Sequence, residues 1–198
     1  MSLNADGRLA VSASEDKTLK VWDIESGCEL RTLRGHSEAV TAVSLNADGR
    51  LAVSASEDKT LKVWDVESGC ELRTLQGHSN AVRGVALTAD GNRAVSAAFY
   101  DTTLKVWDVE SGRELMTIVA HEVWRVAWSS DGRILLSGGG DGIIQVCAME
   151  IDLLMSLARS RVTRNLTPEE SEKYLHREKV PKLPGSDEPL KAWYEGRY

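Results

Sequence analysis

The sequence predicts an all-β fold of stacked antiparallel sheets, and two observations support this prediction. Residues 2–43 recur almost unchanged as residues 44–85, a third and looser copy spans 86–126, and a fourth begins at Ala127 and fades after Cys147. Each complete copy contains four short apolar runs separated by tight-turn signals. A fixed period of 42 residues falls in the range of about 40–45 that marks an array of supersecondary units, which cannot bury their apolar faces alone.

Each complete period contains four predicted strands, and each strand is located by a run of apolar residues. In the second copy, a first apolar run at 40–45 ends before Asp48-Gly49, a tight-turn signal. Alternating residues at 51–55 form a second strand, and after another turn residues 61–64 form a third. Leu72 and Leu75 then mark a fourth, more exposed strand at 72–75. Four short strands joined by tight turns give one antiparallel sheet, and such sheets stack radially as propeller blades.

Short motifs recur in register along these copies. Gly35-His36 precedes Trp64-Asp65, Gly77-His78 precedes Trp107-Asp108, and Trp22-Asp23 stands in the first copy. Over roughly residues 2–147 the pattern resembles the WD40 repeat family of β-propellers. The resemblance implies about four blades and, in each blade, a buried hydrogen-bond network of His, Ser, Asp and Trp. The network positions are His36, Ser54, Asp58 and Trp64, then His78, Ser96, Asp101 and Trp107, with Ser12, Asp16 and Trp22 kept in the first copy and His121, Ser137 and Asp141 in the last.

The repeated His, Ser and Asp set has a second interpretation, as a hydrolase site. Hydrolysis of that kind needs an exposed serine held by a base, with oxyanion donors beside it. Identical sets in several copies favour a structural network, because a catalytic site is rarely copied along an array and buried polar groups must be paired. We therefore expect a protein that is not an enzyme and has no catalytic residue.

Two patterns suggest ion or phosphate sites and are better explained otherwise. The Asp-Gly pairs at 48–49, 90–91 and 131–132 lack the successive acidic ligands of an EF-hand loop, and hairpin turns explain them. The glycines at 138–140 are not followed by the lysine of a phosphate loop. Cysteine and histidine do not cluster with metal-ligand spacing. We expect no metal and no cofactor.

Composition and charge indicate a soluble globular protein with a protein partner. The formal net charge is −6 and the sequence pI is near 5.3, a balance that argues against nucleic acid or an anionic membrane surface as the partner. No apolar stretch approaches the roughly 18 residues that a membrane span needs. Cys28 and Cys70 occupy equivalent repeat positions, too far apart for a disulfide, which favours reduced thiols and a cytoplasmic location.

The C-terminal segment differs from the repeats, so we place a domain boundary between residues 1–148 and 149–198. Apolar residues from Ile151 to Ala158 have helical spacing, and the run 167–170 combines an N-cap, a proline and a capping-box glutamate. We expect a short helical tail that becomes irregular. The stretch 161–167 resembles the tail after the last WD repeat in large bacterial signalling ATPases, which suggests a bacterial protein.

Closure of the propeller is the main physical problem that this sequence raises. The first copy begins near the end of its initial strand, and the last copy lacks a recognisable final strand. An open arc would expose apolar blade faces and strand edges at both ends, which favours association. We expect two copies to pair into a ring of about eight blades. An unclosed arc, or a place within a longer chain, is the alternative.

Positions that differ between otherwise similar repeats are the candidates for partner binding. Propellers bind through loops held by rigid strands, and Thr41, Arg83 and Trp124 are equivalent by register. Arginine, tryptophan and tyrosine are typical interface anchors, although the same differences also fit drift after duplication. We predict a non-catalytic protein-interaction scaffold or sensor, with the propeller portion of a signalling ATPase as the alternative. The candidate binding residues are Glu15, Glu38, Glu57, Asn80, Arg83, Phe99, Tyr100 and Trp124.

Overall fold

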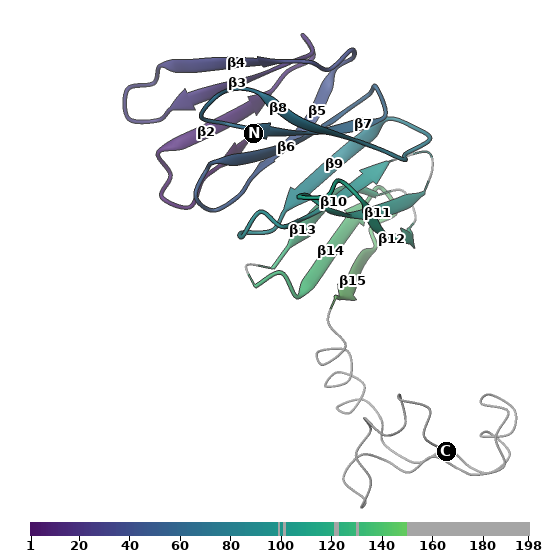
Figure 1. Cartoon of the computed structure of the whole chain (residues 1–198). Helices are drawn as coiled ribbons and strands as arrows, with labels where there is room; N and C mark the ends of the chain where they lie inside the picture. Colours follow the sequence, from purple (N-terminus) through teal and green to yellow (C-terminus); the bar gives the residue numbers. More distant parts are fainter. Residues whose placement is uncertain (99, 101, 121–122, 130, 150–198) are drawn as a thin grey trace, which may run out of the picture. The chain divides into compact units, whose positions relative to one another are not determined.

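The computed structural model describes residues 1–98, 100, 102–120, 123–129 and 131–149. Every regular element in these residues is a β-strand, and the strands form four antiparallel sheets (Figure 1), which we call blades 1 to 4 in chain order. The predicted all-β fold with about four blades is confirmed. The predicted helical tail from residue 150 onward lies outside the described residues, and the boundary predicted at residue 148 stays a prediction.

The described residues form fifteen strands, and within each blade the strands lie side by side in chain order. Blade 1 contains β1 (Ser2–Leu3), β2 (Leu9–Ala13), β3 (Thr18–Asp23) and β4 (Glu29–Arg34). Blade 2 contains β5 (Val40–Leu45), β6 (Leu51–Ser56), β7 (Thr60–Asp65) and β8 (Glu71–Gln76). Blade 3 contains β9 (Val82–Leu87), β10 (Arg93–Ala98), β11 (Thr103–Asp108) and β12 (Glu114–Val119). Blade 4 contains, among the described residues, β13 (Val123–Trp128), β14 (Ile134–Gly139) and β15 (Ile144–Ala148).

The Asp-Gly pairs close hairpin turns, as the turn between β5 and β6 shows. Gly49 has a φ of +75°, a left-handed conformation that glycine adopts without steric cost. The Asp48 carboxylate accepts a hydrogen bond from the backbone N–H of Arg50 at 2.8 Å, and the Asn46 side chain accepts one from Leu51 N–H at 3.0 Å. The carboxylate of Asp48 therefore stabilises the turn by accepting a backbone hydrogen bond within it.

The core lies between successive blades, which pack face to face. We call the side of a blade that meets the next blade its trailing face, and the opposite side its leading face. At the first junction, the trailing face of blade 1 supplies Val11, Leu19, Val21 and Leu33, and the leading face of blade 2 supplies Leu45, Ala52, Trp64 and Val66. At the second junction, the trailing face of blade 2 supplies Val53, Ala55, Leu61, Val63 and Leu75, and the leading face of blade 3 supplies Leu87, Ala94, Trp107 and Val109. Each blade is thus stabilised by burying apolar surface on its neighbours.

The first strands of successive blades lie side by side, with β1 against β5, β5 against β9 and β9 against β13. Polar contacts fix this order: the Thr41 hydroxyl of blade 2 donates to the Val82 carbonyl of blade 3 at 2.6 Å. Likewise, the backbone N–H of Val40 donates to the Ser14 carbonyl of blade 1 at 3.0 Å. The same edge of every blade is therefore brought to one region of the unit Met1–Cys147.

The fourth strands are the most exposed, as the sequence predicts: Leu72 of β8 is 52% exposed, whereas Leu75 faces the next blade and is 1% exposed. The three cysteines are free thiols. The part of the chain that the structure describes contains no helix long and apolar enough to cross a membrane. It also contains no group of three or more His, Cys, Asp or Glu residues that could hold a metal ion.

Candidate functional site

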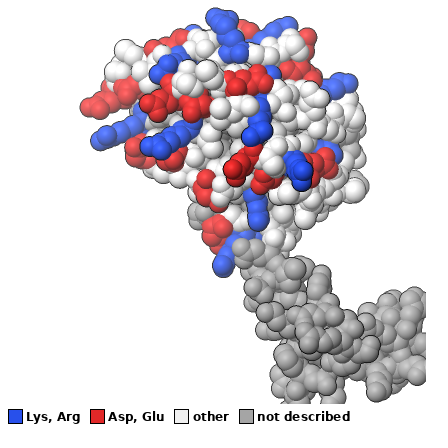
Figure 2. Space-filling view, viewed as in Figure 1, with Lys and Arg blue, Asp and Glu red and all other residues white. Residues whose placement is uncertain are grey.

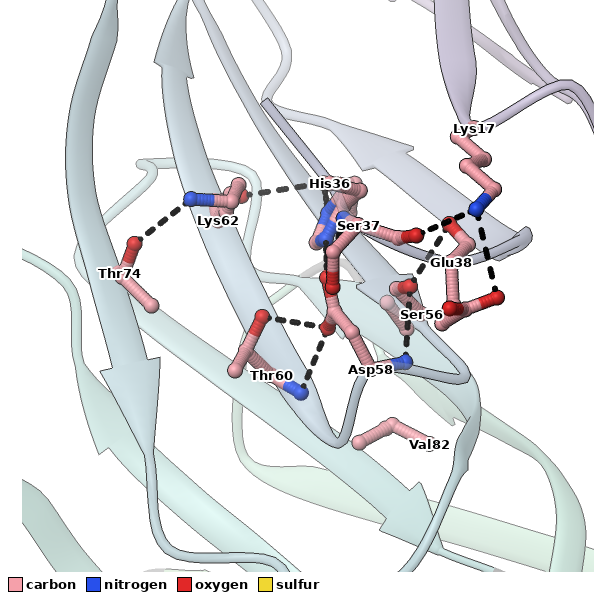
Figure 3. Close-up of polar contacts among 12 residues, drawn as sticks. Lys17, His36, Ser37, Glu38, Ser56, Asp58, Thr60, Lys62, Thr74 and Val82 are labelled. Carbon is pink, nitrogen blue, oxygen red and sulfur yellow. Dashed lines mark hydrogen bonds and ion pairs between the residues drawn. The ribbon is translucent and has the colours of Figure 1, made fainter. Parts of the chain in front are cut away.

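The structure brings His36, Ser54, Asp58 and Trp64 of blade 2 together as one chain of hydrogen bonds. His36 Nδ1 lies 2.8 Å from Asp58 Oδ2, and His36 Nε2 lies 2.7 Å from Ser54 Oγ. The indole N–H of Trp64 donates to the same Ser54 oxygen at 2.8 Å. Figure 3 shows Asp58 held between His36 and Thr60, whose hydroxyl donates to Asp58 Oδ1 at 2.6 Å. The network therefore ties the approach to β5 to strands β6 and β7.

The protonation states follow from burial and from these bonds. Burial lowers the pKa of His36 below its ordinary value, against the opposing influence of Asp58. Burial acts to raise the pKa of Asp58, but hydrogen bonds from Thr60 and His36 outweigh it and hold that pKa below its ordinary value. A neutral His36 donates through Nδ1 to the Asp58 carboxylate and accepts the Ser54 hydroxyl at Nε2, so every partner is satisfied.

Among the described residues, blades 1 and 3 contain part of this arrangement, whereas in blade 4 the buried Ser137 hydroxyl has no hydrogen-bond partner. In blade 3, His78 Nε2 lies 2.6 Å from Ser96 Oγ and Trp107 Nε1 donates to that oxygen at 2.8 Å, whereas Asp101 lies outside the described residues. In blade 1, Trp22 Nε1 donates to Ser12 Oγ at 2.9 Å. Both Ser54 and Ser96 are fully buried, so their hydroxyls face protein groups rather than solvent.

A cleft at the common edge of the blades contains three of the eight predicted binding residues. The starts of β9 and β13 and the segment after β10 line a hollow of about 320 Å³, which we call the aromatic cleft. Trp124 is 51% exposed and Tyr100 is 72% exposed, large values for aromatic side chains. Two arginines beside exposed aromatic rings give a surface that can bind both an anionic group and an apolar one. Its lining residues are Arg83, Tyr100, Trp124 and Arg125.

A second hollow of about 580 Å³, the polar cleft, shares two of these residues and extends across all four blades. In it, Arg83 Nη1 forms an ion pair with Glu57 Oε1 at 2.9 Å. Both side chains of this pair are about two-fifths exposed, so the pair contributes little to stability and leaves both groups accessible to a partner. The polar cleft is lined by Glu15, Ala39, Val40, Thr41, Glu57, Arg83 and Arg125.

Three predicted binding residues lie elsewhere or cannot be placed. Glu38 is exposed and forms an ion pair with Lys17 at 3.5 Å, and Lys17 also donates to the Ser37 carbonyl (Figure 3). Asn80 is half-buried and lines neither cleft. Phe99 lies outside the described residues. The prediction thus identifies five of the residues that line the two clefts.

Arg125 is the functional candidate that sequence reasoning missed. It lines both clefts, and its Nη1 donates to the Trp124 carbonyl at 3.0 Å. Its register equivalents are Ala42 and Gly84, a pair that already differs between the two most similar repeats. This difference between equivalent repeat positions is the same kind of evidence that identifies Trp124, and it would also have identified Arg125.

The charge on the surface is mixed rather than concentrated. Figure 2 shows Lys and Arg interspersed with Asp and Glu on the face in view. Paired examples recur at the same repeat position: Lys62 with Glu71 at 2.7 Å and Lys105 with Glu114 at 2.8 Å. Interspersed charges of this kind do not create the single-signed field that steers nucleic acid.

Comparison with known proteins gives one family and short matches to larger proteins. The family model described as "WD domain, G-beta repeat" matches residues 1–23, 27–65, 69–108 and 112–147. "Nuclear distribution protein PAC1" of Arthroderma otae is 51% identical over 39 residues, which are 20% of this chain and 8% of that protein. "Dynein assembly factor with WD repeat domains 1" of Mus musculus is 46% identical over 44 residues, which are 22% of this chain and 11% of that protein. The chain therefore matches only about a tenth of the length of these relatives.

Proposed function

This chain belongs to the WD40 repeat family, and from that premise we propose that it is a non-catalytic protein-binding module, a scaffold or a sensor. The observation that carries the proposal is the aromatic cleft, where Trp124 and Tyr100 are exposed beside Arg83 and Arg125. Tryptophan, tyrosine and arginine dominate the energetics of protein interfaces. Rigid strands hold these side chains at one edge, which is the usual arrangement for a binding surface on a repeat scaffold.

The partner surface that fits the aromatic cleft presents a carboxylate next to an apolar side chain. Glu57 neutralises Arg83 in part, whereas Arg125 donates to a backbone carbonyl, which carries no charge. A planar guanidinium binds a carboxylate through two parallel hydrogen bonds. The adjacent indole ring of Trp124 supplies apolar area with few rotatable bonds to order.

The absence of catalysis is part of the proposal, and burial of the serines supports it. Ser54 and Ser96 are fully buried, and each receives the indole N–H of a tryptophan. A substrate carbonyl has no route to such a hydroxyl without opening the junction between two blades. The repetition of this arrangement along the array also fits a structural role.

A pull-down from cell extract tests the proposed role directly. We expect Trp124→Ala and Arg125→Ala each to reduce recovery of a specific partner at least tenfold, because such anchors contribute about 2 kcal/mol or more. The matched control is Leu72→Ala, since Leu72 is as exposed as Trp124 but lies on the outer strand β8. Equal recovery with all three variants would contradict the proposal. It would indicate that the exposed aromatic residues arose by sequence drift after duplication and do not bind a partner.

The cellular location, the class of partner and the oligomeric state are proposed from the sequence alone. We place the protein in the cytoplasm, with a protein rather than a nucleic acid or a membrane as its partner, and as a dimer or as part of a longer chain. The stretch 161–167 favours a second candidate function, the sensor propeller of a bacterial signalling ATPase, although it lies outside the described residues. An in-frame nucleotide-binding module upstream in the genome would support that candidate, and an upstream stop codon would contradict it.

A further inference from the structure

The leading face of blade 1 is exposed at positions that are buried in the next two blades. Leu3 is 52% exposed, whereas its equivalents in blades 2 and 3, Leu45 and Leu87, are each 7% exposed. Ile24 is 48% exposed, whereas its equivalent Val66 is 4% exposed. These side chains occupy the positions that make a blade junction elsewhere in the chain, but in blade 1 none of the described residues buries them to the same extent.

The trailing face of blade 4 shows the same contrast. Ile144 is 72% exposed and Val146 is 61% exposed, whereas the equivalent residues of blade 3, Leu104 and Val106, are 0% and 2% exposed. Leu136 is 39% exposed and continues this apolar surface on β14.

Among the described residues, the two exposed faces correspond in register to the two halves of an internal blade junction. The leading face of blade 1 presents the same side chains in the same register as blade 2 presents to blade 1. Only one of the four core positions differs, and the change from valine to isoleucine is conservative. The matched positions are Leu3 and Leu45, Ala10 and Ala52, Trp22 and Trp64, and Ile24 and Val66.

Backbone hydrogen bonds at the junctions repeat as well. The N–H of Ala5 donates to the Ala47 carbonyl at 2.9 Å, and the N–H of Ala47 donates to the Ala89 carbonyl at 2.9 Å. Each turn between the first and second strands is therefore tied to the corresponding turn of the next blade. The Ala5 carbonyl of blade 1 stands at the acceptor position of this series, on the leading side.

We propose that the occupant of these faces is a second copy of this chain, docked head to tail. The leading face of blade 1 of one copy packs on the trailing face of blade 4 of the other, in the manner of the internal junctions. This contact is heterologous, and a second identical junction closes the pair when the rotation from blade to blade completes a full turn. Two copies of four blades give eight, within the range of about 4–8 blades found in propellers. The proposal does not depend on the partner-binding role of the aromatic cleft.

The test uses the full chain with one charged substitution on either face. Ile24→Asp blocks the leading face and Ile144→Asp blocks the trailing face, because a carboxylate buried without a partner opposes association. The matched control is Leu72→Asp, at a leucine that is 52% exposed on the outer strand of blade 2. All three side chains are about half or more exposed in a single chain, so the substitutions leave the fold of the monomer intact.

Native mass spectrometry and light scattering from about 1 µM to about 100 µM then give the stoichiometry. We expect a dimer for the unaltered chain and for Leu72→Asp. Each face variant alone should dissociate with a constant raised about 100-fold or more, a change of about 2.7 kcal/mol. An equimolar mixture of Ile24→Asp and Ile144→Asp should form a one-to-one heterodimer, because one leading and one trailing face remain intact between them.

Three outcomes would overturn the proposal. The first is an unaltered chain that is monomeric and folded, by circular dichroism, at the highest concentration. The second is a dimer formed by either face variant alone, which would indicate that two leading faces or two trailing faces pair with each other. The third is a mixture that yields no heterodimer although both variants melt cooperatively. Partner recovery in the pull-down is measured separately, so failure of self-association leaves the proposed binding role standing.

Discussion

The indole N–H of Trp64 lies 2.8 Å from the hydroxyl oxygen of Ser54. The two residues face each other across strands β6 and β7, and His36 approaches the same hydroxyl from the segment before β5. One small side chain therefore satisfies two larger buried groups. Because Trp107 and Ser96 repeat the distance of 2.8 Å in blade 3, the arrangement belongs to the blade and not to one position in the chain.

Replacing Ser54 with alanine should destabilise the fold substantially. The change leaves the Trp64 N–H and the His36 Nε2 atom buried without a partner, and each such group costs about 1–3 kcal/mol. Urea denaturation gives the free energy of unfolding. The equivalent change in blade 1, Ser12→Ala, should cost less, since Ser12 serves only a half-buried Trp22.

The control for this pair is Ser37→Ala, at an exposed serine that forms hydrogen bonds through its backbone N–H and carbonyl. It should change the free energy of unfolding by no more than about 0.5 kcal/mol. Equal losses for Ser54→Ala and Ser37→Ala would mean that the network contributes nothing beyond ordinary surface polarity.

Stability should fall as the pH falls below about 6.5. The pKa of His36 is lower in the folded state than in the unfolded chain, mainly through burial. The unfolded state therefore binds more protons in that interval, and the free energy of unfolding rises with pH. The pKa of Asp58 is also lowered in the folded state, which adds a further loss of stability as the pH falls through its ordinary range near 3.8 and below.

Urea titrations at pH 8, 6.5 and 5 measure this dependence. His36→Asn, which has no titrating ring, should show a smaller loss of stability between the highest and lowest pH, whatever its stability at pH 8. A free energy of unfolding that increases on acidification over this interval would contradict the assignment of a neutral, buried His36.

The fold could be predicted from the sequence because the same pattern of strands and turns recurs in every blade. A strand that is ambiguous in one copy is defined by its equivalents, and the recurring His, Ser, Asp and Trp spacing identifies which side chains meet. Asp58 and Trp64 are separated by six positions, as are Asp101 and Trp107, and in blade 2 this spacing carries the chain from the turn into the third strand. Local pattern and global packing agree, as expected for a repeat array.

The binding surface could be predicted only in part, because register identifies equivalent positions but not their surroundings. Trp124 and Arg83 stand out by comparison with Thr41. The place of Arg125 in both clefts depends on how closely β13 approaches β9, which no pattern along the chain contains. Glu38 differs between repeats in the same way, yet it pairs with Lys17 away from both clefts.

Gly84 should be needed for the close approach of β9 to β13. A Cβ atom at this position would lie 3.0 Å from the Trp124 carbonyl oxygen, so alanine forces the strands apart or strains the backbone. We expect Gly84→Ala to destabilise the fold by about 1–3 kcal/mol and to lower partner recovery by displacing Trp124. The equivalent residue in blade 2 is alanine, and the reverse change Ala42→Gly should cost only about 0.5–1 kcal/mol. Thermal denaturation that ranks the two changes the other way would contradict this contact.

Lys59 offers a site where the protein can be made more stable. It follows Asp58 in the turn between β6 and β7 with a φ of 70°, a left-handed conformation that costs a residue with a Cβ about 1–2 kcal/mol. Glycine removes this strain but loses about 0.5–1 kcal/mol to its greater freedom in the unfolded chain. Lys59→Gly should therefore raise the free energy of unfolding by up to about 1.5 kcal/mol. Lys59→Ala, which keeps the strain and removes the charge, should have almost no effect. If urea denaturation shows both variants equally stabilised, removal of the charge rather than relief of backbone strain is the cause.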